Sequence, residues 1–177
     1  VFPSFSLGFM AAQHLLERGH RRLALVRPDD PIHITQETAF LQRLEGMRAA
    51  IAQQPDVTLD ILPLSLSTAV AHKMIECRFA EADHATGIYA YNDEYALLLL
   101  GAFTCRGIQV PQEIGIVGTD NISVGEYCCP PLTSISFDTL DIGKRAVELF
   151  HSLHQGLPFP EELTLPLVPK LIIRGSA

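Results

Sequence analysis

The sequence predicts an α/β fold in which helices flank a parallel β-sheet. Short apolar runs alternate along the chain with segments of helical periodicity. The helical segments are long enough to act as crossovers between parallel strands. The unit at residues 87–118 shows the pattern most clearly, because a strand, an apolar helix and a second strand follow one another there. Together these observations favour a right-handed βαβ architecture.

The first half of the chain contains five expected elements. Residues 6–18 repeat apolar side chains at helical spacing, and a glycine ends the repeat. Residues 22–26 (RLALV) form a short buried strand. A second helical repeat covers residues 36–52, residues 57–64 resemble a strand, and residues 67–79 form a helix that begins at a serine or threonine cap.

The second half continues the alternation. Strands are expected at 86–90, 114–118 and 132–137, and a helix at 94–106. The segment 139–154 is an amphipathic helix. Its apolar face is formed by Ile142, Ala146, Leu149, Phe150 and Leu153. The chain closes with a proline-rich stretch at 156–169 and a short strand at 171–174.

Composition limits the possible functions. The 177 residues suffice for one well-buried domain, and 47% of them are hydrophobic. A net charge of −7 gives the chain no general attraction for nucleic acid. Any DNA contact would need a segment outside this chain. No apolar run reaches the roughly 18 residues of a membrane span.

The cysteines and histidines do not indicate a metal site or a cofactor. Cys77, Cys105, Cys128 and Cys129 lack metal-ligand or redox spacing, and we expect reduced, half-buried thiols in a cytoplasmic protein. The pair of histidines in the last helix has no acidic or cysteine partner nearby. No phosphate-binding loop, nucleophile elbow or complete dinucleotide fingerprint occurs. The sequence therefore does not favour an enzyme.

Polar residues follow the expected strands at their carboxyl ends, where open parallel sheets bind ligands. Asn92 could cap a helix or face a cleft. Asp120 could form an Asx-turn or contact a ligand. Arg43 could be a solvated surface residue or a donor in the same cleft. Tyr91 and Phe137 flank these positions and could pack in the core or give a ligand a flat apolar face.

Five segments of the chain resemble, in order, the signature segments of LacI/GalR-type transcriptional regulators. The combination of ND, VP-I-VG-D and PPLT is the most specific part of this resemblance. The segments are HLLERGHRRLALV (14–26), QRLEGMRAAI (42–51), YNDEYALLLLGAFTCRGIQVPQEIGIVGTDN (91–121), PPLTSISFD (130–138) and IGKRAVELF (142–150). The resemblance implies the type I periplasmic-binding-protein-like fold of an effector-binding domain.

The resemblance also implies roles for particular residues. It places effector contacts at Arg43, Asn92, Asp120 and Phe137, beside Tyr91. This sequence has GTDN where the family has G-[FY]-D-D, so the second acid is missing. Subunit pairing in a homodimer or higher homo-oligomer is expected at Leu97, Leu100, Gly101, Tyr127, Cys128 and Pro130.

The same resemblance predicts how the chain is divided. Residues 1–136 and 169–177 would form the carboxyl-terminal lobe, and residues 138–168 would return to a mostly absent amino-terminal lobe. By the same resemblance the DNA-binding headpiece would be missing. The chain lacks an initiator methionine and enters a helix almost at once, which suggests a fragment of a longer protein. The apolar face of the 139–154 helix should then be exposed or covered by another copy of the chain.

The leading hypothesis is an effector-sensing and dimerisation domain of a transcriptional regulator. It would bind a small polar metabolite, with a sugar expected, in a cleft between two lobes and so control operator binding through the headpiece. The alternative is a periplasmic-type solute-binding receptor for sugar uptake, which shares the fold. An α/β enzyme is a third class, but the sequence lacks a nucleophile–base pair.

Overall fold

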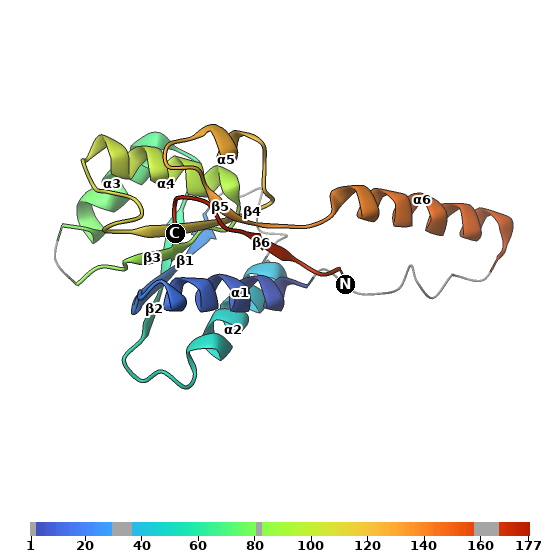
Figure 1. Ribbon diagram of the computed structural model, residues 1–177, viewed down its shortest axis with the longest axis horizontal. Helices are drawn as coiled ribbons and strands as arrows, with labels where there is room; N and C mark the ends of the chain where they lie inside the picture. Colours follow the sequence, from blue (N-terminus) through green and yellow to red (C-terminus); the bar gives the residue numbers. More distant parts are fainter. Residues whose placement is uncertain (1–2, 30–36, 81–82, 158–166) are drawn as a thin grey trace.

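The computed structural model describes residues 3–29, 37–80, 83–157 and 167–177 (Figure 1). These residues form six strands and six helices. The strands are β1 (Arg22–Pro28), β2 (Thr58–Leu64), β3 (Gly87–Tyr89), β4 (Gly115–Thr119), β5 (Thr133–Ser136) and β6 (Lys170–Ile172). The helices are α1 (Ser4–Glu17), α2 (Glu37–Ile51), α3 (Thr68–Arg78), α4 (Asp93–Cys105), α5 (Val124–Tyr127) and α6 (Thr139–Gln155).

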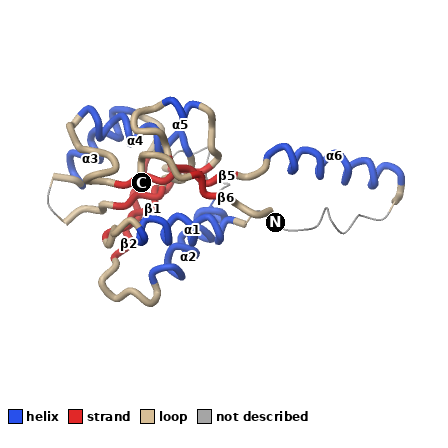
Figure 2. Tube along the Cα trace, viewed as in Figure 1, coloured by secondary structure: helices blue, strands red, loops and turns tan. Residues whose placement is uncertain are grey.

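The strands form one sheet in the order β2-β1-β3-β4-β5-β6. β1 to β5 pair in parallel, and β6 pairs antiparallel with β5. α1 and α2 cover one face of the sheet, and α3 and α4 cover the other (Figures 1 and 2). The predicted α/β class is therefore confirmed, with one antiparallel edge strand. The chain leaves β1 toward β2 and leaves β3 toward β4, so the connections diverge between β1 and β3.

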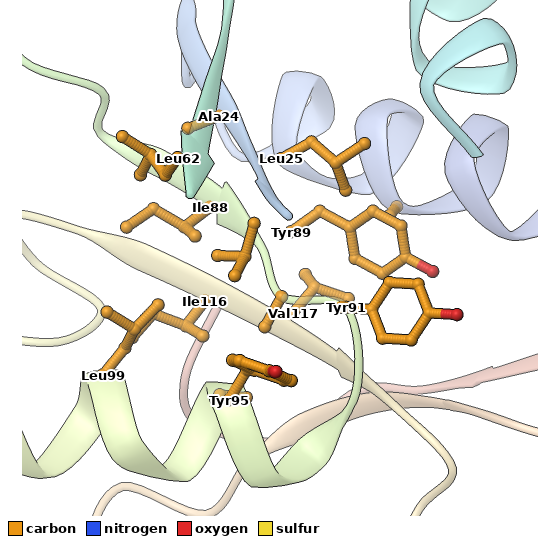
Figure 3. Close-up of a cluster of buried hydrophobic side chains, with 14 of the residues drawn as sticks. Ala24, Leu25, Leu62, Ile88, Tyr89, Tyr91, Tyr95, Leu99, Ile116 and Val117 are labelled. Atoms are coloured by element: carbon orange, nitrogen blue, oxygen red, sulfur yellow. The ribbon is translucent and has the colours of Figure 1, made fainter. Parts of the chain in front are cut away.

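The core lies between the sheet and its two helical layers. β4 is buried along all five residues, and β1 along four consecutive ones, as expected for strands covered on both faces. In Figure 3, Leu25 and Tyr89 point toward α1 and α2, whereas Ile116 lies next to Leu99 of α4. The continuous apolar runs seen in the sequence thus mark central strands.

Two glycines allow α1 and α2 to cross closely. A Cβ atom on Gly8 would lie 1.9 Å from the carbonyl oxygen of Arg43, and one on Gly46 would lie 2.0 Å from that of Phe5. Neither position can accept a side chain without moving backbone. The crossing therefore fixes how α2 sits on the sheet, including the turn that carries Arg43.

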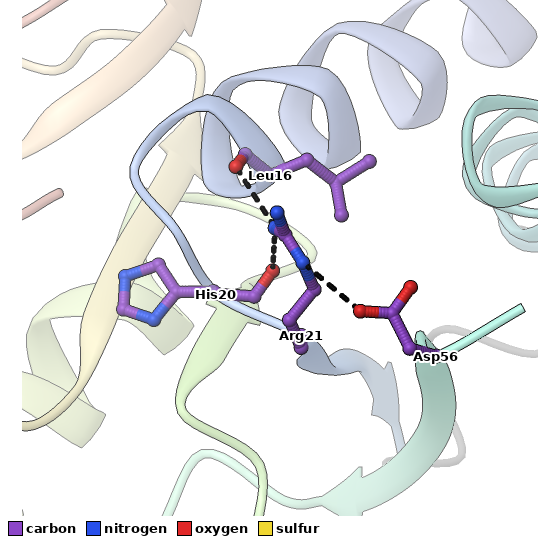
Figure 4. A network of polar contacts seen from close by, with 4 residues as sticks. All are labelled: Leu16, His20, Arg21 and Asp56. Carbon is purple, nitrogen blue, oxygen red and sulfur yellow. Dashed lines mark hydrogen bonds and ion pairs between the residues drawn. The ribbon is translucent and has the colours of Figure 1, made fainter. Parts of the chain in front are cut away.

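Arg21 secures the junction between α1 and β1 (Figure 4). Its Nη1 donates hydrogen bonds of 3.1 Å to the carbonyl oxygens of Leu16 and His20, and its Nε lies 3.4 Å from Oδ2 of Asp56. These contacts satisfy one backbone acceptor in the last turn of α1 and one in the turn between α1 and β1. Arg21 therefore joins the end of α1 to the loop that precedes β2.

α6 projects away from the sheet and its covering helices (Figure 1). Four of its apolar residues are 60–76% exposed, namely Leu140, Val147, Phe150 and Leu153. Of the face that the sequence indicated, Ala146 is also exposed, and Ile142 and Leu149 are half-buried. This face is therefore not completely buried against the rest of the described chain.

Some details differ from the sequence-based expectations. α5 was not expected, because a four-residue helix shows no periodicity. β6 ends at Ile172 and α1 begins at Ser4, so both are shifted from the expected bounds. The cysteines are free, but only Cys128 is half-buried. The other three are exposed, because they lie on the outer surfaces of α3 and α4 and in the loop after α5.

Candidate functional site

Arg43 reaches the carboxyl edge of the sheet from α2, beside the point where the connections of β1 and β3 diverge. Its side chain is buried, so the interpretation as a solvated surface residue is wrong. Its Nη1 donates to the carbonyl oxygen of Tyr91, and its guanidinium carbon lies 4.3 Å from the centre of the Tyr91 ring. Its Nε is buried and has no hydrogen-bond partner among the described residues. Arg43 therefore brings a positive charge to this edge, while its Nε is enclosed by the protein.

Asn92 follows β3 and is the N-cap of α4. Its Oδ1 accepts a hydrogen bond of 3.2 Å from the backbone N–H of Tyr95, so the capping role is confirmed. The residue is half-buried. Since the cap uses the oxygen, the amide NH2 can still donate to a ligand. A ligand contact by Asn92 thus stays a prediction that is compatible with capping.

Asp120 follows β4 in an unusual backbone conformation. Its φ is 102° and that of Asn121 is 51°, both in the left-handed region that non-glycine residues rarely adopt. Its backbone N–H donates to the carbonyl oxygen of Ile135 at 2.9 Å. Desolvation raises the pKa of the Asp120 carboxyl to about 6, although the residue keeps an exposed surface. Arg43 opposes this rise, whereas Asp93 and Glu94 add to it.

The two aromatic candidates belong mainly to the core. Tyr91 is 6% exposed and Phe137 is 9% exposed, so each can offer a ligand only an edge. Close to Tyr91, the hydroxyls of Tyr89 and Thr119 share a buried hydrogen bond of 2.9 Å. Burial raises the pKa of both tyrosines, and the positive charge of Arg43 opposes the rise. The two tyrosine side chains at this edge of the sheet therefore stay uncharged at neutral pH.

The structure gathers the three polar candidates at one edge of the sheet. Arg43 contacts Tyr91, which precedes Asn92. Asp120 follows β4, which pairs directly with β3. The charge of Arg43 influences the pKa of Asp120, which also places these two groups near each other. This edge is the usual ligand position in open parallel sheets.

Sequence reasoning missed a buried carboxylate beside this edge. Asp93 is 1% exposed, and its Oδ1 accepts a hydrogen bond of 2.7 Å from the hydroxyl of Ser134. Its Oδ2 accepts one of 2.8 Å from the backbone N–H of Ile122. Desolvation raises the pKa of Asp93, and these hydrogen bonds oppose the rise. The signal in the sequence was the Asp of the ND pair, but its partner Ser134 lies 41 residues away.

The residues expected to pair subunits differ in accessibility. Tyr127 is 79% exposed and Gly101 is exposed. Leu97, Cys128 and Pro130 are half-buried. Leu100 is only 4% exposed, because it packs into the core of its own chain, and it offers little surface to a partner. Subunit pairing itself remains a prediction.

The described residues contain no group of three or more His, Cys, Asp or Glu side chains arranged to hold a metal ion. None of the helices in the described ranges combines the length and apolar character that a membrane span requires.

The chain matches a known family over nearly its whole length. The family profile of the periplasmic binding protein-like domain covers residues 12–177. The chain therefore belongs to the periplasmic binding protein-like domain family. Within it, the relatives are repressors, and the chain is an effector-binding domain of the LacI/GalR type.

Similar proteins support this placement. The HTH-type transcriptional repressor PurR of Haemophilus influenzae (strain PittEE) is 26% identical over 178 residues, which is 98% of this chain and 51% of the repressor. The PurR of Vibrio atlanticus is 30% identical over 149 residues, which is 80% of this chain and 42% of the repressor. The chain thus spans about half the length of the curated relatives that it matches.

Solved structures show the same relationship. A LacI family transcriptional regulator from Enterococcus faecium, solved with bound ribose, is 30% identical, with a TM-score of 0.78 over 99% of this chain and 63% of that one. A regulatory protein of the LacI family from Chloroflexus aggregans is 26% identical, with a TM-score of 0.81 over 99% of this chain and 62% of that one.

Proposed function

We propose that this chain binds a small neutral sugar as the effector-sensing part of a LacI/GalR-type DNA-binding regulator. The observation that carries the proposal is the convergence of Arg43, Asn92 and Asp120 at the carboxyl edge of the sheet. They lie beside the point where the connections of β1 and β3 diverge. In doubly wound sheets of this strand order, ligands bind at that point.

The chemistry of the three groups suits a polyhydroxyl ligand. The Asp120 carboxylate can accept hydrogen bonds from sugar hydroxyls, and the Arg43 guanidinium and the Asn92 amide can donate to sugar oxygens. Asp120, Asp93 and Glu94 place negative charge near the Arg43 guanidinium, which disfavours an anionic ligand. The ribose bound to the 30% identical Enterococcus faecium regulator makes a pentose the first candidate.

The rest of the proposal concerns regulation. A second lobe would close over the ligand, and a ligand that favours one closure angle would change operator affinity through a DNA-binding headpiece. The protein would act in the cytoplasm as a homodimer or higher homo-oligomer. The repressor names of the relatives favour this role over that of a sugar-uptake receptor.

Calorimetric titration of the purified protein with ribose, other neutral sugars and nucleobases tests the proposal. We expect Arg43→Ala to weaken binding of the best ligand about 10–100-fold, since hydrogen bonds to charged groups contribute about 1.5–3 kcal/mol. Asp120→Ala should act in the same direction. The matched control is Arg48→Ala, which removes an exposed arginine from the same helix and should leave affinity unchanged. Wild-type affinity in both Arg43→Ala and Asp120→Ala would remove these residues from the site.

A further inference from the structure

The corner that carries Asp120 is held in a costly conformation. Asp120 and Asn121 have φ values of 102° and 51° in succession. A non-glycine residue in a sparsely populated region is strained and persists only where its surroundings enforce it. The groups that enforce this conformation therefore determine where the Asp120 carboxylate points.

Two buried side chains bind the backbone of this corner. The N–H of Asn121 donates to Oγ of Ser134 at 3.0 Å, and that hydroxyl donates to Oδ1 of Asp93 at 2.7 Å. The N–H of Ile122 donates to Oδ2 of Asp93 at 2.8 Å. Both N–H groups that follow Asp120 are thus satisfied by one connected pair. The two hydrogen bonds that the Asp93 carboxylate accepts are of the stronger, charge-assisted kind.

Gly118 and Arg174 lie around Asp93, Ser134 and the corner, and both support this arrangement. A Cβ atom on Gly118 would lie 2.1 Å from Oδ1 of Asp93, so glycine leaves the space that the carboxylate fills. Arg174 donates to Oδ1 of Asn121 and to the carbonyl oxygen of Leu132, each at 2.8 Å. Residues from three other parts of the chain, Asp93, Ser134 and Arg174, therefore fix the same corner.

We propose that Asp93 and Ser134 are positioning residues for the ligand site, which they serve by holding the corner that aims Asp120. This inference rests on the proposed function, because it assumes that Asp120 contacts the ligand. Asp93 is 1% exposed and Ser134 is fully buried, so neither reaches a ligand in the cleft. Any effect of these residues on binding must pass through the backbone that they hold.

Ser134→Ala tests the proposal, with Ser176→Ala as its matched control. Ser176 is also fully buried, and its hydroxyl likewise accepts from a backbone N–H, that of Thr133 at 2.8 Å, and donates, to the carbonyl oxygen of Ile116 at 2.6 Å. Both substitutions remove a buried hydroxyl that binds a backbone N–H, but only Ser134 contacts the corner. Three readouts are used: amide hydrogen exchange of Asn121 and Ile122, the pKa of Asp120 from carboxyl ¹³C NMR, and ribose affinity from calorimetry.

We expect Ser134→Ala to accelerate exchange of the two amides and to weaken ribose binding, each about tenfold, the equivalent of one lost hydrogen bond. The pKa of Asp120 should move toward its ordinary value as the carboxylate gains water. Ser176→Ala should change none of the three. Asp93→Asn keeps one of the two acceptor oxygens, so its changes in amide exchange, Asp120 pKa and ribose affinity should lie between those of wild type and Ser134→Ala. If Ser134→Ala does not fold, Asp93→Asn tests the positioning role instead.

Unchanged amide exchange and Asp120 pKa in Ser134→Ala, or equal changes in Ser176→Ala, would overturn the positioning role. The absence of ribose binding by the wild-type protein would instead count against ribose as the ligand. In that case the exchange and pKa measurements, which need no ligand, still decide whether Asp93 and Ser134 hold the corner.

Discussion

The close crossing of α1 and α2 predicts how much an added methyl group at Gly46 would lower the free energy of unfolding. In Gly46→Ala the new methyl carbon would lie 2.0 Å from the carbonyl oxygen of Phe5, well inside the 3.4 Å at which ordinary contact begins. Both atoms belong to helical backbone or lie next to it, so one helix must move. Overpacking of this kind costs about 1–3 kcal/mol or more, and alanine's better helix propensity recovers at most about 1 kcal/mol. We expect Gly46→Ala to lower the free energy of unfolding by about 2 kcal/mol.

Urea denaturation followed by circular dichroism measures this change, which should also lower Tm by about 4–8 °C in a chain of this length. The matched control is Gly101→Ala, also within a helix, where an added Cβ meets no atom within 4 Å. It should gain up to about 1 kcal/mol. If Gly46→Ala were as stable as wild type, the reasoning about the close crossing would be refuted.

Three further predictions concern charged and titratable groups. Because burial raises the pKa of Asp120 to about 6, its ionisation costs stability as pH rises from about 4 to 6. Asp120→Asn should therefore have a higher free energy of unfolding than wild type at pH 7, by less than about 1 kcal/mol because solvent screens the charge. Urea titrations below pH 4 should give the same free energy of unfolding for both proteins. Burial lowers the pKa of His14, so stability should fall as pH drops below 6.5, and His14→Leu should flatten that fall in the same titrations. Arg21→Ala should cost about 1–2 kcal/mol, whereas Asp56→Ala should cost less than about 1 kcal/mol, because only Arg21 also satisfies backbone carbonyls. Equal losses of Tm in these two variants would contradict that account.

Much of the fold could be predicted from local patterns. Continuous apolar runs marked β1 and β4, and helical spacing marked α2 and α4, because burial on one or both faces imposes these periods. Strand order and the antiparallel direction of β6 could not be predicted in the same way. They depend on which strands meet in space, and a three-residue strand such as β6 carries little pattern.

The position of the candidate site could be predicted from the sequence, but the contacts that hold it could not. Arg43, Asn92 and Asp120 could be associated because the carboxyl ends of parallel strands share one edge. The double role of Asn92 as cap and candidate donor was open from the sequence, and the structure confirms the cap. Ser134 was not found, since a serine inside an apolar strand carries no local signal of a partner 41 residues away. The burial of Leu100 could not be predicted, since helical periodicity does not say which apolar face meets the chain's own core.

The placement of α6 has a mechanical consequence. In the sequence it lies between β5 and β6, which pair with each other at one border of the sheet. A protein or lobe that binds α6 and moves it would therefore act on β5 and β6 together. β5 contains Ser134, which binds the backbone N–H of Asn121, and it leads directly into Phe137. A displacement of β5 would therefore reach the residue next to Asp120 through this hydrogen bond.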